Sequence, residues 1–95
     1  MALHLSIEGI VQGVGYRQWF RRQATGLGVS GWVRNRADES VEAVIEGTDE
    51  AVEALLRQAM SGPAGAKVDR IERRAATVAE RAAGPAEGMA ILPTE

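Results

Sequence analysis

Apolar and polar residues alternate over positions 3–10, which predicts a half-buried strand at the start of the chain. The apolar positions of this strand are Leu3, Leu5 and Ile7. From Tyr16 the apolar residues recur every three or four positions instead, which is typical of a helix with one buried face. Gly26 or Gly28 is expected to end that helix.

The same patterns divide the rest of the chain. Residues 30–36 and 40–46 read as two strands separated by only three residues, which predicts a hairpin. A second helix is expected after Thr48, because threonine is a favoured N-cap, and Gly62 is expected to end it. The remaining segments are a weak strand at 68–74, an Ala- and Gly-rich loop at 77–87 and a short last strand at 88–93.

The predicted order of elements is β-α-β-β-α-β. This order is typical of the split βαβ arrangement, an α+β fold in which both helices cover one face of an antiparallel sheet. Ninety-five residues are near the commonest domain size, so we expect a single domain over residues 1–95.

Composition excludes several classes of function. The net charge of −2 argues against a nucleic-acid binder, because such domains are usually basic. The absence of cysteine excludes disulfides, zinc–thiolate sites and a thiolate nucleophile. No signal peptide and no apolar run of about 20 residues is found, so we expect a cytoplasmic, non-membrane protein and, by default, a monomer.

The junction between the first strand and the first helix is rich in glycine, with the sequence Gly9-Ile-Val-Gln-Gly-Val-Gly-Tyr-Arg17. Glycines allow successive main-chain N–H groups to point into one concavity, and the helix N-terminus behind them adds partial positive charge. Such a place binds oxyanions. The junction lacks the Gly-Lys-Ser/Thr ending of a Walker loop and the third glycine of a dinucleotide fingerprint. On local chemistry alone, a turn without a ligand is an equal alternative.

Arg17 favours the anion-binding interpretation. It lies in the first turn of the predicted helix, where a cation opposes the helix dipole and stability would favour an acid. Its planar guanidinium suits two phosphate oxygens at once. A solvated surface arginine remains the alternative.

Few other residues offer catalytic chemistry. His4 is the only histidine, and without an apparent partner it is expected at the surface. The acids of the second helix are expected on its solvated exterior, without a metal; they are Asp49, Glu50 and Glu53. An anion cradle without nucleophile, metal or strong base suits a substrate with a good leaving group. An acyl phosphate is such a substrate, because the acid that it releases has a pKa near ~4.

Two linked motifs resemble those of the acylphosphatase family. The first is the stretch from Gly9 to Arg17, and the second is Gly31-Trp-Val-Arg-Asn35, followed by Val41 and Gly47. Between them, Ala24, Leu27 and Gly28 also fit the family pattern. The resemblance covers essentially the whole chain.

The resemblance implies a ferredoxin-like fold and hydrolysis of the carboxyl–phosphate bond of small acyl phosphates, without metal or cofactor. It implies that Arg17 binds the phosphate and that Asn35 orients the attacking water. The loop residues implied to bind phosphate are Gln12, Gly13, Val14, Gly15, Tyr16 and Arg17. Inorganic phosphate or sulfate is then expected to compete with the substrate. Of these residues, Asn35 rests on the resemblance alone.

Two positions depart from the family pattern. Glu39 stands in the predicted hairpin turn where the family usually has glycine, so it must adopt a backbone conformation that disfavours it by about 1 kcal/mol. Met89 stands where the family usually has phenylalanine, and is expected to fill the same core position flexibly.

The alternative function is a binding module that uses its sheet or loop for nucleic acid or a protein partner. RNA-binding modules of this kind stack bases on exposed sheet aromatics, and Trp32 is the only plausible one here. A unit acting on carbamoyl phosphate within a larger assembly is a related possibility, against which the length of 95 residues counts.

Overall fold

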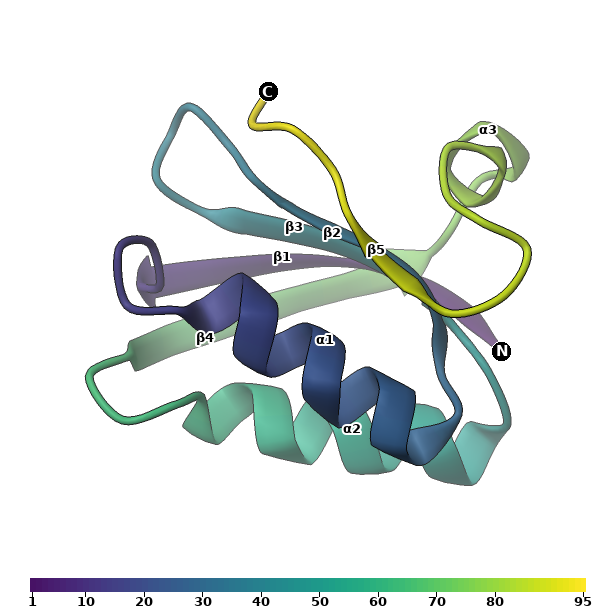
Figure 1. Cartoon of the computed structure of the whole chain (residues 1–95), viewed down its shortest axis with the longest axis horizontal. Helices are drawn as coiled ribbons and strands as arrows, with labels where there is room; N and C mark the ends of the chain where they lie inside the picture. The colour runs from purple at the N-terminus through teal and green to yellow at the C-terminus, as the bar shows by residue number, and fades with distance from the viewer.

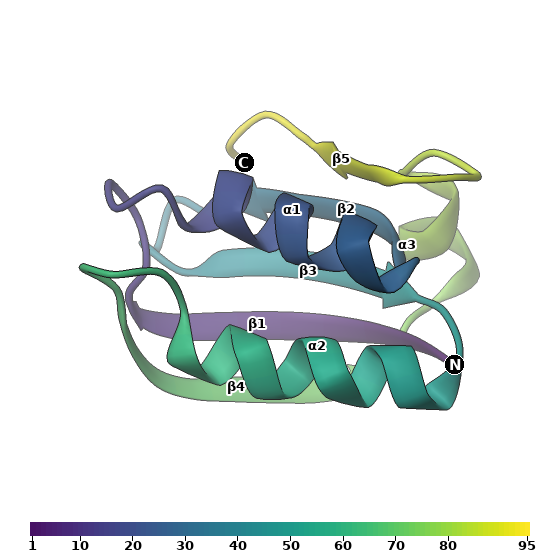
Figure 2. The same cartoon turned by 60° about the horizontal axis from the view of Figure 1, so that its bottom comes forward.

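The computed structural model describes residues 1–95, which form one sheet with two long helices packed against one face (Figures 1 and 2). The strands are β1 (Ala2–Ile10), β2 (Ser30–Asn35), β3 (Val41–Glu46), β4 (Lys67–Ala75) and β5 (Met89–Ile91). The helices are α1 (Tyr16–Leu27), α2 (Asp49–Ser61) and α3 (Val78–Ala82). The strand order across the sheet is β4-β1-β3-β2-β5. None of the helices is long and apolar enough to cross a membrane.

The predicted apolar positions form the core between the sheet and the helices α1 and α2. Leu5 and Ile7 of β1 and Phe20 of α1 are fully buried, and each such side chain stabilises the fold by about 1.5–3 kcal/mol. The helix α2 contributes Val52, Leu55, Leu56 and Ala59. Met89 of β5 is buried in the same cluster, so its predicted place in the core is confirmed.

The ferredoxin-like α+β arrangement is confirmed, but the sheet is mixed. β1 pairs antiparallel with β3 and β4, and β2 pairs antiparallel with β3. β5 instead runs parallel to β2, so the prediction of a wholly antiparallel sheet is wrong at this edge. A strand of three residues is too short to show a direction in its sequence pattern, and the connection from α3 sets its direction.

The prediction of a loop over residues 77–87 is wrong for residues 78–82 and correct for the residues around them. Residues 78–82 form α3, which begins with a capping box in which Thr77 and Glu80 each accept a hydrogen bond from the other's main-chain N–H. The Thr-x-x-Glu spacing was visible in the sequence, but the Ala and Gly around it obscured a helix of five residues. α3 covers the sheet face opposite α1 and α2, where Trp32 Nε1 donates to the carbonyl oxygen of Glu80 at 2.7 Å.

The β2–β3 hairpin closes through a tight turn, as predicted. Asp38 Oδ1 accepts hydrogen bonds from the main-chain N–H and the hydroxyl of Ser40. Glu39 has a φ of 74° and is the one residue other than glycine in the left-handed region. The strained turn expected at this position is therefore confirmed, and it stores about 1 kcal/mol.

Candidate functional site

The segment Val11–Gly15, called the glycine loop below, joins the end of β1 to the start of α1. Gly13 and Gly15 have φ values of 74° and 77°, which only glycine adopts readily. No atom lies within 4 Å of the place where a side chain of either glycine would start, so the space before the loop is open. The main-chain N–H groups of the loop donate no hydrogen bond within the protein after Val11. These N–H groups are therefore free to donate hydrogen bonds to a ligand.

The N-terminus of α1 is not neutralised by the protein itself. Gly15 is its N-cap, no side chain caps it, and its first turn has no acid. In contrast, the hydroxyl of Thr48 caps α2, whose first turn has two acids. A helix end with free N–H groups and no acid favours an anion from outside the chain.

Arg17 is the second residue of α1, and its side chain makes no hydrogen bond or ion pair within the protein. It lines a pocket of about 140 Å³ together with Gln12, Gly13, Gly15 and other residues of this region. Arg34 and Arg74, in contrast, are paired with carboxylates. Other unpaired arginines exist, such as Arg21 and Arg22, but only Arg17 lines this pocket. A free guanidinium beside free amides provides charge and several N–H donors for a tetrahedral oxyanion.

Asn35 is the last residue of β2, and its Oδ1 is buried without a hydrogen-bond partner. Leaving such an acceptor unpaired costs about 1–3 kcal/mol, so a group that donates to this oxygen would be favoured. Asn35 does not line the small pocket around Arg17. The two regions are joined by the side chain of Gln12, whose Nε2 donates to the carbonyl oxygens of Arg36 and Ser40 at 2.8 Å. The glycine loop and the hairpin turn accordingly lie at the same end of the molecule, at the left in Figure 1.

Tyr16 anchors the start of α1 beneath the glycine loop. Its hydroxyl donates to the carbonyl oxygen of Ala59 in α2 at 2.8 Å, and its ring stacks on Phe20 with centroids 6.1 Å apart. Burial raises the pKa of the Tyr16 phenol well above its usual range. The phenol therefore stays neutral and holds the helix in place rather than moving protons.

His4 has a partner, so the prediction of an unpartnered surface histidine is wrong. Its Nε2 lies 2.7 Å from Glu42 Oε2, and its side chain is only 13% exposed. Burial would raise the pKa of Glu42, but hydrogen bonds from His4 and Arg34 outweigh this and lower it. The partner is 38 residues away in sequence and reaches His4 through the pairing of β1 with β3, which no local pattern shows.

The ligand atoms of His4, Glu42 and Glu80 lie within 4.8 Å of one another, which is close enough to hold a metal ion. Both carboxylates are already bonded to arginines: Glu42 to Arg34 and Glu80 to Arg74. The group is therefore electrostatically satisfied as an ion-pair network. It lies on the sheet face covered by α3, away from the glycine loop.

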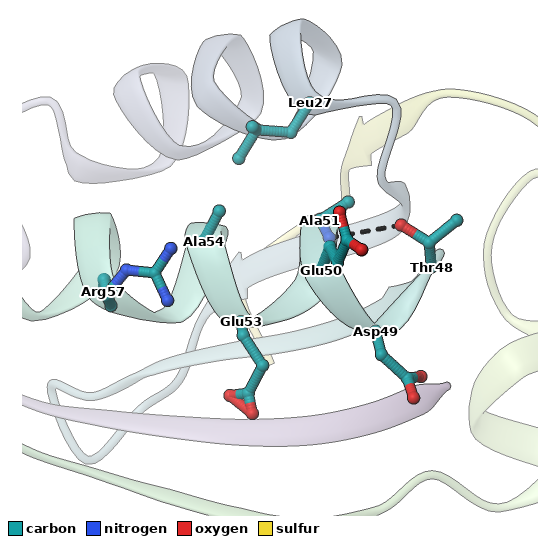
Figure 3. A pocket seen from close by; sticks show the side chains of 8 residues that line it. All are labelled: Leu27, Thr48, Asp49, Glu50, Ala51, Glu53, Ala54 and Arg57. Atoms are coloured by element: carbon teal, nitrogen blue, oxygen red, sulfur yellow. Dashed lines mark hydrogen bonds between the residues drawn. The ribbon is translucent and has the colours of Figure 1, made fainter.

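A larger hollow of about 750 Å³ lies between the end of α1 and the start of α2 (Figure 3). Its residues include Leu27, Thr48 and the three acids predicted on the helix exterior. Asp49 and Glu50 are exposed, as predicted, whereas Glu53 pairs with Arg73, whose hydrogen bond lowers the pKa of the glutamate. This hollow lies at the opposite end of α1 from the glycine loop and carries the wrong charge for an anion. Although it is larger than the pocket beside Arg17, this hollow does not suit a phosphate group.

Comparisons with known proteins agree with the sequence motifs. The family model described as acylphosphatase matches residues 3–84. A protein named acylphosphatase from Thiobacillus denitrificans is 61% identical over 70 residues, which are 74% of this chain and 79% of that protein. Its namesake from Nitrobacter hamburgensis is 47% identical over 89 residues, 93% of this chain and 90% of the other. A solved structure of an acylphosphatase from Coxiella burnetii has a TM-score of 0.84 at 26% identity and covers 96% of this chain and 90% of its own.

Proposed function

The chain belongs to the acylphosphatase family, enzymes that hydrolyse acyl phosphates, and we propose that its own catalysis depends on Arg17, the glycine loop and Asn35. In this proposal Arg17 and the loop amides bind the phosphoryl group of a small acyl phosphate. Asn35 orients the water that attacks the phosphorus.

The binding role of the loop is supported by its free donors. The N–H groups of Gln12 to Gly15 and the uncapped start of α1 all lack acceptors within the protein. Arg17 adds a full positive charge at the same pocket. Charge on the three phosphoryl oxygens is spread out in the transition state, and fixed donors around it stabilise that state without reorganising.

The observation that carries the catalytic role of Asn35 is its buried, unpartnered Oδ1. A water molecule that donates one proton to this oxygen would satisfy it and would point a lone pair of its own oxygen elsewhere. Positioning a nucleophile in this way lowers the barrier because orientational freedom is lost before the reaction rather than during it.

The chemical step needs little else from the protein. The water oxygen forms a bond to phosphorus while the bond from phosphorus to the acyl oxygen breaks, and the carboxylate leaves with the electron pair. The proton lost by the water ends on the phosphate product or in solvent. A carboxylate whose acid has a pKa near ~4 leaves without being protonated, so no general acid is required.

The alternative of an RNA-binding sheet loses its main support. Trp32, the aromatic on which that alternative depended, is 2% exposed beneath α3. A base therefore has no aromatic surface on this face to stack against.

The test is hydrolysis of acetyl or benzoyl phosphate by the purified protein in the presence of EDTA, with inorganic phosphate as a competitor. For Asn35→Ala we expect kcat to fall by about 10²–10³-fold, a loss typical of one transition-state contact. KM and the inhibition constant of phosphate should stay close to wild type, because Arg17 and the loop are intact.

Gln58→Ala provides the matched control. Gln58 Oε1 is the other buried side-chain oxygen without a partner, and it belongs to α2 rather than to β2. We expect its removal to leave kcat unchanged. Equal losses in both variants, or loss of phosphate binding together with turnover in Asn35→Ala, would contradict the water-orienting role.

A further inference from the structure

We propose that the side chain of Gln12 is a positioning residue that holds Asn35 in fixed relation to the phosphate-binding loop. This inference rests on the proposed function, because it assigns a consequence to the placement of Asn35. It concerns the side-chain amide of Gln12, whereas binding of phosphate by the loop uses the main-chain N–H groups.

The geometry of the contact is specific. Gln12 Nε2 carries two protons, and both are donated to main-chain carbonyl oxygens at 2.8 Å, one from Arg36 and one from Ser40. These two residues face each other across the mouth of the β2–β3 turn, where the N–H of Arg36 donates to the Ser40 oxygen at 2.9 Å. The amide therefore ties the glycine loop to both sides of the hairpin turn, next to the ends of β2 and β3.

A primary amide fits this place better than other side chains. The Arg36 oxygen also accepts from the N–H of Glu39, and the Ser40 oxygen from that of Arg36. Each carbonyl oxygen then accepts two hydrogen bonds, which uses both of its lone pairs. A carboxylate of the same shape would instead place negative charge against two carbonyl oxygens.

The contact reaches Asn35 through one peptide unit. Arg36 follows Asn35 directly, so fixing the Arg36 carbonyl limits the position of the Asn35 main chain. Glu95 holds the same stretch by its own main chain, since its N–H donates to the Asn35 oxygen and its oxygen accepts from Ala37. Gln12 is the contact that ties this stretch to the phosphate loop, and it sets where the Asn35 side chain lies relative to bound phosphate.

The expected effect of removing the Gln12 contact follows from how steeply the reaction rate depends on the position of a catalytic side chain. A misplacement of ~1 Å costs about 10²-fold in rate. With Glu95 still holding one side, we expect Gln12→Met to lower kcat by about 10–100-fold, with KM and phosphate inhibition within about threefold of wild type. Methionine keeps the length and removes both donors without adding charge.

A double-mutant cycle with Asn35→Ala tests whether Gln12 acts through Asn35. If it does, Gln12→Met lowers kcat in the wild-type background but not in the Asn35→Ala background. An equal fall in both backgrounds, or a rise in KM with unchanged kcat, would overturn the inference. Thermal unfolding and phosphate-induced NMR shifts of each variant establish that it is folded and binds the ion.

The pH profile of Gln12→Glu gives a readout that a general loss of structure would not reproduce. At neutral pH the introduced carboxylate repels the two carbonyl oxygens, whereas its protonated form donates one of the lost hydrogen bonds. The kcat of this variant relative to wild type should therefore rise as pH falls. Gln18 lines the same pocket and its side chain makes no hydrogen bond to the hairpin, so Gln18→Glu measures the effect of added charge alone. A flat ratio for Gln12→Glu, or the same profile in both variants, would count against the inference.

The kcat values of Asn35→Ala and Gln12→Met together show whether the role of Asn35 or only that of Gln12 is wrong. Wild-type kcat in Asn35→Ala would reject the water-orienting role itself. A large loss in Asn35→Ala together with full activity in Gln12→Met would reject only the role of Gln12.

Discussion

Polar groups gather in two regions: the end of the molecule around the glycine loop, and the sheet face beneath α3. The two regions differ in whether these groups have partners within the protein. Beneath α3, His4 and Arg34 bond to Glu42, and Arg74 bonds to Glu80. Around the loop, the amides, Arg17 and the Asn35 oxygen have no partner within the protein. The first region is electrostatically complete without a ligand, and the second is not.

Whether a polar group is paired distinguishes a structural role from a functional one better than the residue type does. A histidine between two glutamates is chemically the more suggestive group, yet its contacts are those of an ion-pair network. An unpaired buried polar atom lowers stability by about 1–3 kcal/mol, and a ligand that hydrogen-bonds to it removes that penalty. We therefore predict that turnover depends on the loop end and that the ion pairs on the α3 face contribute to stability.

The largest expected difference is between the kcat/KM values of two variants, one with an arginine replaced at the glycine loop and one with an arginine replaced beneath α3. We expect Arg17→Ala to lower kcat/KM by about 10³-fold or more, because the phosphoryl group loses its charged ligand. Its stability should rise slightly, since a cation at a helix N-terminus is unfavourable by about 0.3–1 kcal/mol. Arg74→Ala should leave kcat/KM unchanged and slightly reduce stability. Acyl-phosphate kinetics and urea unfolding of both proteins measure the four quantities.

Similar behaviour of the two variants would show that the two regions do not differ in role. Wild-type kcat/KM in a folded Arg17→Ala protein would show that the free guanidinium is only solvated surface. A turnover defect in Arg74→Ala would show that the α3 face contributes to catalysis.

Replacing two glycines, one at the N-cap of α1 and one inside this helix, should give a smaller difference in activity. Gly15 has a φ of 77°, whereas exposed Gly26 lies inside α1, and a side chain at either position would meet no atom within 4 Å. Gly15→Ala should therefore reduce stability by about 1–2 kcal/mol through backbone strain, and kcat/KM by about tenfold as the amides shift. Gly26→Ala should raise stability by about 0.5–1 kcal/mol and leave activity unchanged. A Gly15→Ala protein with normal phosphate affinity and turnover would mean that the loop conformation is not required.

Much of the fold was readable in the sequence because it depends on local periodicity. The alternation at Leu3, Leu5 and Ile7 and the glycines that bound α1 specify their elements within a few residues. The parallel direction of β5 was not readable, because three residues carry no pattern that distinguishes direction. The loop and Arg17 were readable for a related reason: both belong to one continuous stretch of chain.

The rest of the site depends on contacts between distant residues. Nothing around Asn35 in sequence shows that its oxygen is buried and unpartnered, so the role predicted for it rests on the family resemblance. Gln12 was assigned through its main-chain amide, and its side chain reaches residues 24 and 28 positions away. His4 and Glu42 are likewise joined only by strand pairing. Such contacts follow from the assembled sheet.

Acid titration of Glu80, in the paired region beneath α3, has the smallest expected effect. Hydrogen bonds from Arg74 and then from the Thr77 N–H lower the pKa of Glu80 from its ordinary 4.5 to about 2. Because the folded state binds the proton less readily than the unfolded state, the stabilisation is fully present above about pH 4.5. It is lost progressively as pH falls toward about 2.

Glu80→Gln isolates this contribution, because glutamine still serves in the capping box while the charge opposite Arg74 is removed. We expect wild type to be the more stable protein at neutral pH and the difference in unfolding free energy to shrink between pH 5 and pH 2. Urea unfolding of both proteins at a series of pH values measures this difference, and acyl-phosphate kinetics at neutral pH should give identical kcat values. A stability difference that stays constant down to pH 2 would remove the Arg74–Glu80 pair as its source. A change in kcat would instead tie the α3 face to the chemistry at the glycine loop.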